Sequence, residues 1–213
     1  LSAQGKDISS LADARQAVID GLADIVPIKE VPREDGRIAL FTTGGAILLD
    51  GTEPSRIGFE TTPGITPDMS VTDGSLPRLT MNGKPLTAGQ MEMFDGGTIS
   101  ANFSIRDQIA PGYQQQIDAF ARDLYDRMAD PAIDPSLAAG GPGLFTDAQA
   151  ALNPTDETGL AGRIAVTNLV DPSAGGDLWR IRAGIHAATP GNAGDSGLLG
   201  RLTAALSASR LPT

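Results

Sequence analysis

The sequence predicts an elongated α+β protein in which two long antiparallel helices and a short C-terminal helix pack as a stem, with antiparallel β hairpins inserted between them. Two segments and the C-terminal end carry apolar residues at helical spacing, whereas short alternating segments separated by glycine turns lie between the first two. Helices and strands do not alternate regularly, which argues against a βαβ enzyme. We expect a helical stem (residues 1–30, 100–130 and 190–213), an antiparallel β-rich region (31–99) and a loop-rich segment with a short strand and helix (131–189).

The first predicted helix covers residues 7–26. Its stripe has a 3-4-3-4-3 spacing and comprises Ile8, Leu11, Arg15, Val18, Leu22 and Ile25. Such a stripe needs a partner surface, because a covered apolar side chain contributes roughly 1.5–3 kcal/mol and an exposed one does not. Arg15 either specifies the register of that contact or lays its alkyl stem along the stripe with the guanidinium in solvent. Pro27 ends the helix.

Turn signals divide the next region into short strands. Asp35-Gly36 lies between residues 26–31 and 37–41, in which apolar residues alternate, so this stretch predicts a hairpin. Asn82-Gly83 has the composition of a type I′ turn, and Pro85 places the following strand at a sheet edge.

The second long helix is predicted from Asn102 or Ser104 to Ala129. Its stripe, with 4-4-3-4-4 spacing, comprises Ile109, Tyr113, Ile117, Phe120, Leu124 and Met128. We expect this stripe to pack on the first helix. Pro111 and Gly112 should kink the helix or split off a short leading segment.

The remaining third of the chain is rich in turns. Leu144 and Phe145 are a possible anchor for a long loop, and residues 163–169 alternate like a strand. A helix through residues 177–183 carries Trp179, and a last helix begins near Asp195 or Ser196.

Composition and charge exclude several classes of function. The 213 residues carry a net charge of −10, with no cysteine and a single histidine, His186. Disulfides, thiolate nucleophiles and zinc ribbons are therefore excluded, and nucleic acid and anionic membrane surfaces are disfavoured as partners. No apolar run approaches the roughly 20 residues that span a bilayer.

No motif supports catalysis or metal binding. Gly194-Asp195-Ser196-Gly197 matches the core of the trypsin-like nucleophile motif, but Leu198 stands where that motif has a second glycine, and His186 is only ten residues away. Ser196 is better interpreted as the N-cap of the last helix, with its side-chain oxygen accepting from free amides. The acidic pairs lack the spacing of a calcium loop. We expect no catalytic residue, cofactor or metal.

An ordered set of short motifs resembles the flagellar hook-associated protein 1 family, the first junction protein between hook and filament. The motifs occupy residues 7–15, 22–26, 43–51, 96–100, 105–107 and 116–121. They include a double glycine at Gly96-Gly97 and the pair Arg106-Asp107. Gln16 departs from the pattern, since the family usually carries an aspartate there.

The resemblance implies a non-enzymatic structural subunit of the flagellum. The implied partners are the hook protein, the next hook-associated junction protein and further copies of the full-length chain in a ring. It also implies export through the flagellar apparatus and an extracellular location. The terminal helices of the family are not recognised here, so we expect an outer portion of a longer chain that is monomeric by itself. Arg106, Asp107, Ile117, Phe120 and Leu124 join the first stripe as expected helix-packing or assembly residues.

Two other functions stay open from the sequence. A cell-surface binding or adhesion module would need a pocket where aromatic and polar groups converge, to which Phe59, Phe94 and Trp179 could contribute. An enzyme that uses Ser196 or acidic residues is the third.

Overall fold

The computed structural model describes residues 9–209 and divides the chain into two compact units, residues 1–111 and 112–213. Both units combine short helices with small antiparallel sheets, so the α+β class is correct. The arrangement predicted within that class is wrong, because there is one helix of 31 residues and the other helices are short. Two long helices packed as a stem with inserted hairpins are not present in the described part of the chain.

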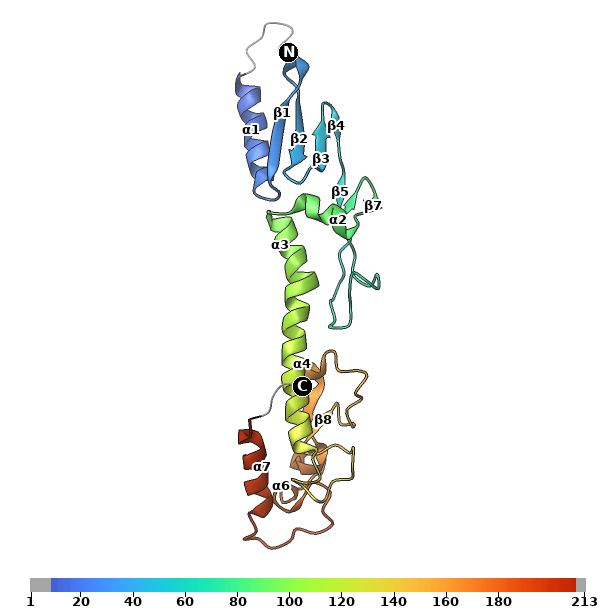
Figure 1. Ribbon diagram of the computed structural model, residues 1–213, viewed down its shortest axis with the longest axis vertical. Coiled ribbons are helices and arrows are strands. Elements are labelled where there is room, and N and C mark those ends of the chain that lie inside the picture. The colour runs from blue at the N-terminus through green and yellow to red at the C-terminus, as the bar shows by residue number, and fades with distance from the viewer. Residues whose placement is uncertain (1–8, 210–213) are drawn as a thin grey trace. The chain divides into compact units, whose positions relative to one another are not determined.

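The first unit opens with helix α1 (Ser9–Ala23) and a four-stranded antiparallel sheet (Figure 1). The strands lie in chain order: β1 (Ile28–Pro32), β2 (Ile38–Thr42), β3 (Ile47–Asp50) and β4 (Glu53–Pro54). The predicted hairpin at Asp35-Gly36 is confirmed: both residues have positive φ, and Ile28 pairs with Thr42 across the two strands.

Helix α1 packs on this sheet and not on the second long helix. Ile19 is 7% exposed and forms a core cluster with Ile38 and Leu40. Leu22 is partly buried and packs against this cluster. The helix ends at Ala23, before the predicted stop at Pro27, and strand β1 runs back beside it (Figure 1). The sheet is thus the nearest apolar surface, which explains why the predicted helix-on-helix contact does not form.

A second, three-stranded sheet has the order β5 (Ile57–Gly58), β6 (Thr80–Met81), β7 (Lys84–Pro85). The turn at Asn82-Gly83 has φ of 52° and 77°, as a type I′ turn requires. Pro85 lies on the edge strand β7, as predicted. A capping box between Thr87 and Gln90 starts the short helix α2 (Ala88–Met91), which leads into the 3₁₀ turn η3 (Glu92–Phe94). The main core of the unit consists of Val26, Ala46, Leu79, Leu86 and Phe94.

The long helix comprises α3 (Thr98–Ser104), a π turn η4 (Ile105–Ile109) and α4 (Ala110–Met128). It begins at Gly97, where a Cβ atom would lie 2.3 Å from the Ile25 carbonyl oxygen, so only glycine fits. The helix does not split at Pro111. The π turn lies just before Pro111, and in it the Ala110 N–H donates to the Ile105 carbonyl five residues earlier. This shifts the register of the helical hydrogen bonds before Pro111, which has no N–H to donate.

The second unit packs short elements around residues 112–128 of α4. A two-stranded sheet pairs β8 (Phe145–Asp147) with β9 (Ile164–Val166), which follows α5 (Leu160–Arg163). The 3₁₀ turns η5 (Asn168–Val170) and η6 (Pro172–Ala174) lead to α6 (Arg180–Ala183) and α7 (Gly197–Ser207). Leu137, Val170 and Ile185 form its core, against which Leu144 packs, so the predicted anchor is confirmed for Leu144.

Both ends of α7 are held by side chains. Ser196 occupies the N-cap position but makes no side-chain cap; instead Asp195 Oδ1 accepts from the Gly197 N–H at 2.9 Å, which corrects the predicted role of the serine. At the other end the buried Arg127 donates from Nη1 to the carbonyl oxygens of Ala205 and Ala208 at 2.5 and 2.6 Å. A cation there complements the negative end of the helix dipole.

Candidate assembly surfaces

Helix α1 keeps an apolar face in solvent. Leu11 and Val18 lie seven residues apart on the helix and both are exposed, Val18 by 71%, whereas the exposed Ile25 lies in the turn that follows the helix. Ile19 carries the buried face, about a third of a turn away from Val18. Leu22 is half-buried at the edge of the core, and Ile8 lies outside the described residues. The stripe predicted from sequence therefore divides into a covered edge and an exposed face.

Arg15 is exposed and makes a contact that the sequence did not indicate. Its Nη1 donates to the Gly36 carbonyl oxygen at 3.0 Å, which ties the helix to the turn between β1 and β2. Gly36 has a positive φ in this turn, and it lies 21 residues after Arg15 in the sequence. The arginine thus helps to hold α1 on its sheet.

The part of α4 in the second unit carries another exposed apolar face. Tyr113, Ile117 and Phe120 are exposed, Phe120 by 71%, and Leu124 continues the face half-buried. Their 4-3-4 spacing places them along one side of the helix, as in the seam of a packed helix pair. We refer to Tyr113, Ile117, Phe120 and Leu124 as the α4 seam.

The side of α4 about a quarter of a turn from the α4 seam is occupied by its own unit. Ala121, Tyr125 and Met128 are buried there, and the Tyr125 hydroxyl accepts from the Leu152 N–H at 3.0 Å. Asp118, only 6% exposed, accepts from the N–H groups of Gly159 and Ala161, both at 2.8 Å. Because these contacts fix which side of α4 faces inward, the α4 seam is held outward.

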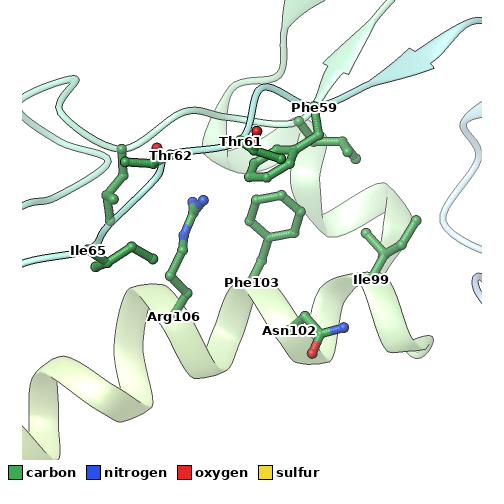
Figure 2. A pocket seen from close by; sticks show the side chains of 10 residues that line it. Phe59, Thr61, Thr62, Ile65, Ile99, Asn102, Phe103 and Arg106 are labelled. Carbon is green, nitrogen blue, oxygen red and sulfur yellow. The ribbon is translucent and has the colours of Figure 1, made fainter.

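Arg106 and Asp107 lie in the π turn with their side chains largely covered, and Arg106 points toward the loop that follows β5 (Figure 2). The Arg106 guanidinium forms a two-pronged ion pair with Asp107, Nε to Oδ1 at 2.5 Å and Nη2 to Oδ2 at 3.0 Å. Its Nη1 donates to the Pro77 carbonyl oxygen at 3.0 Å. Its centre lies 4.7 Å from the Phe103 ring centroid, close enough for a cation–π contact. Arg106 thereby ties the long helix to the loop before β6.

A pocket of about 520 Å³ opens beside this arginine (Figure 2). Its lining is largely apolar and includes Phe59, Ile65, Leu79, Phe103 and the Arg106 guanidinium. Phe59 and Phe103 meet edge to face, with ring centroids 5.5 Å apart. No sequence pattern indicated the pocket, because its walls come from a loop and a helix about 40 residues apart.

The residues considered for an adhesion module or an enzyme do not gather at one site. Of the three aromatic residues proposed for an adhesion pocket, Phe59 lines the pocket, Phe94 is buried in the main core, and Trp179 belongs to the second unit. His186 Nε2 lies 3.4 Å from the Pro142 carbonyl oxygen, so the histidine faces a loop carbonyl.

Two further features were sought among residues 9–209. No helix there is long and apolar enough to cross a membrane. That part of the chain also contains no group of three or more histidine or acidic side chains that could hold a metal ion.

Residues 1–130 match the family model of the helical domain of the flagellar hook-associated protein FlgK. The chain belongs to this family. The matched residues include the exposed face of α1, the π turn and the α4 seam. The resemblance drawn from the ordered motifs is confirmed, and with it a structural role in the flagellum in association with hook components. The FlgK family is structural and not a family of enzymes. No curated protein matches the chain.

Proposed function

We propose that this FlgK-family protein is a structural subunit of the junction between hook and filament, and that it assembles by packing of helices. The α4 seam is the observation that carries the proposal. Three large apolar side chains, Tyr113, Ile117 and Phe120, face solvent at helical spacing, although an adjacent side of the helix is packed. Covering each of them would contribute roughly 1.5–3 kcal/mol.

The partner of the α4 seam is proposed to be a helix. A spacing of four and three residues matches the ridges and grooves of a second helix, and the matched family model describes this part of the chain as a helical domain. The exposed face of α1, with Leu11 and Val18 seven residues apart, is also apolar. Leu22 lies beside the α1 face and Leu124 is the half-buried end of the α4 seam. Arg106 and Asp107 hold the long helix on its loop and act as positioning residues.

Two different apolar faces suit a ring or helical array. In such an array each subunit uses one patch to contact the previous copy and another to contact the next, so the patches need not be alike. We propose hook protein and the next hook-associated protein as neighbours at the two ends of the ring. We also propose an extracellular location reached through flagellar export, which the absence of cysteine from the sequence supports.

The test is to replace the gene in the producing bacterium by variants of the full-length protein. Phe120→Asp places a charge in the α4 seam, and we expect hooks without filaments and loss of swimming. Ala119→Asp is the matched control, since it adds the same charge at an exposed position on another side of the helix. Circular dichroism of both purified variants establishes that they are folded.

Location is tested separately by gold labelling of intact cells with antibodies against this chain. A narrow band where hook meets filament is expected. Label spread over the cell surface with bare flagella would contradict the proposal, as would normal filaments on cells that produce folded Phe120→Asp protein.

A further inference from the structure

The turn between β6 and β7 consists of Asn82 and Gly83, the one place in the sequence where a glycine follows an asparagine. Both residues are exposed, and no atom lies within 4 Å of the place where a Cβ atom on Gly83 would be. A glycine leaves its backbone nitrogen open to the side chain of the preceding residue, because it has no side chain of its own. An asparagine in this setting is chemically reactive.

The reaction open to this pair is intramolecular deamidation. The Gly83 backbone nitrogen loses its proton and attacks Cγ of Asn82, so that a C–N bond forms, the bond from Cγ to Nδ2 breaks and Nδ2 leaves as ammonia. The product is a cyclic succinimide. Water then opens the ring at one of its two carbonyl carbons, which gives either aspartate or isoaspartate. In isoaspartate the main chain runs through Cβ and is one methylene longer.

The folded turn holds the reacting atoms apart. Asn82 has a φ of 52°, and in a type I′ turn its ψ is about 30°, which places the Gly83 nitrogen on the far side of the Cα–C bond from Cβ. The Asn82 N–H donates to the Arg56 carbonyl oxygen at 2.8 Å, and Asn82 Oδ1 accepts from the Arg56 N–H at 2.8 Å. Ring closure therefore requires the turn to open and the side chain to leave Arg56.

The isoaspartyl product does not fit this hairpin. Met81 pairs with Lys84 across the two-residue turn, and beyond them the Leu86 N–H donates to the Leu79 carbonyl oxygen at 2.8 Å. Leu79 and Leu86 are 4% and 3% exposed and belong to the main core of the unit. A connection that is one methylene longer lacks the geometry of a type I′ turn, so both the pairing and the burial of the two leucines are weakened.

We propose that Asn82 is a site of spontaneous deamidation that the folded hairpin restrains, and that its isoaspartyl product prevents the hairpin from closing in its original form. The Arg56 N–H is the group that restrains the side chain. A transient opening of the turn thereby leads to a permanent covalent change. This proposal does not depend on the place of the protein in the flagellum, because the reaction needs only the chain and water.

The restraint is tested by incubating the purified protein in neutral buffer, with and without guanidinium chloride, and following Asn82 by mass spectrometry of its peptides. Deamidation in the folded protein is expected to be at least about tenfold slower than in the denaturant. Asn192 is the internal control, since it is exposed but Ala193 follows it, and it should react slowly in both samples. Equal rates at Asn82 in the two samples would overturn the proposal, as would no reaction of Asn82 in the denaturant.

The part of Arg56 is tested with two substitutions. Arg56→Pro removes the N–H from which Asn82 Oδ1 accepts, and we expect Asn82 of the folded variant to deamidate about fivefold faster. Arg56→Ala is the matched control, because it keeps the N–H and should react like the wild type. Circular dichroism establishes that both variants are folded, and the comparison in denaturant requires neither of them. Equal rates in the two folded variants would contradict the restraint by Arg56.

The effect of the product is tested by separating the isoaspartyl protein and measuring hydrogen exchange by NMR. The Leu86 amide is expected to exchange at least about tenfold faster than in Asn82→Asp, which carries the same charge without the extra methylene. Equal exchange in the two proteins would mean that the hairpin closes around the isoaspartate, and it would overturn the proposed effect on the core.

Discussion

At the residue scale, a buried polar side chain beside the α4 seam determines which side of the helix faces solvent. Asp118 is the clearest case, since one buried carboxylate accepts from two backbone N–H groups of the loop around α5 and from the Gln114 amide at 2.9 Å. Asp134 likewise holds a second loop, since its Oδ2 accepts from the Ile185 N–H at 2.9 Å. A buried carboxylate with several donors is costly to remove, because the donors are left unpaired.

Asp118→Ala is therefore expected to lower the free energy of unfolding by about 3 kcal/mol, since hydrogen bonds to charged groups contribute roughly 1.5–3 kcal/mol each. Chemical denaturation measures this change. Asp126→Ala is the control: Asp126 is paired with Arg122 near the surface, and its loss should cost less than about 1 kcal/mol. Equal losses in the two variants would show that Asp118 does not hold the loop.

A pH prediction concerns the turn at residues 70–75. Hydrogen bonds from the Ser75 hydroxyl and N–H hold the pKa of Asp73 below the usual value for an aspartate. A pKa that is lower in the folded chain than in the unfolded one stabilises the turn above about pH 4, and this contribution is lost as the pH falls through the folded value.

Ser75→Ala should raise the pKa of Asp73, as followed by NMR titration of its carboxyl carbon. Ser173→Ala should instead raise the pKa of Asp171, which is lowered by the corresponding bonds from Ser173. An unchanged Asp73 titration in Ser75→Ala would contradict the assigned cause.

At the scale of elements, adjacent residues of α1 have opposite roles. The helix needs one face for its own sheet, and Ile19 supplies it, while Val18 belongs to the exposed face with Leu11. An apolar stripe in a sequence therefore does not by itself tell which apolar residues are covered within the chain and which are left for a partner.

Ile19→Ala should lower the free energy of unfolding by roughly 2–4 kcal/mol, because it leaves a cavity between α1 and the sheet. Val18→Ala should change it by less than about 0.5 kcal/mol and should instead weaken assembly of the full-length protein. Thermal denaturation and sedimentation measure the two effects. The division of roles would be wrong if Val18→Ala destabilised the chain as much as Ile19→Ala.

At the scale of the whole molecule, charge opposes the proposed assembly. A net charge of −10 on 213 residues means that neighbouring copies repel one another unless salt screens them. Moderate salt screens the repulsion between charges but does not weaken the hydrophobic attraction between the apolar faces of α1 and α4.

Assembly of the full-length protein, followed by light scattering, is therefore expected to accelerate as salt is raised from about 0.01 M to about 0.15 M, where the Debye length falls from about 30 Å to about 8 Å. Slower assembly at the higher salt would indicate that ion pairs, and not apolar faces, dominate the contacts between copies.

The sequence by itself determined the α+β class, the hairpins at Asp35-Gly36 and Asn82-Gly83, the position of the second helix and, through the order of its motifs, the family. These features depend on local chemistry: turn residues that adopt positive φ, a proline that cannot donate, and apolar residues at helical spacing.

Only the tertiary structure decided which surface each helix covers. Ile19 packs on a sheet, Arg15 reaches Gly36, and the pocket at Arg106 unites residues about 40 positions apart. Such contacts depend on where the chain returns in space, and the spacing of residues along one helix carries no information about that path.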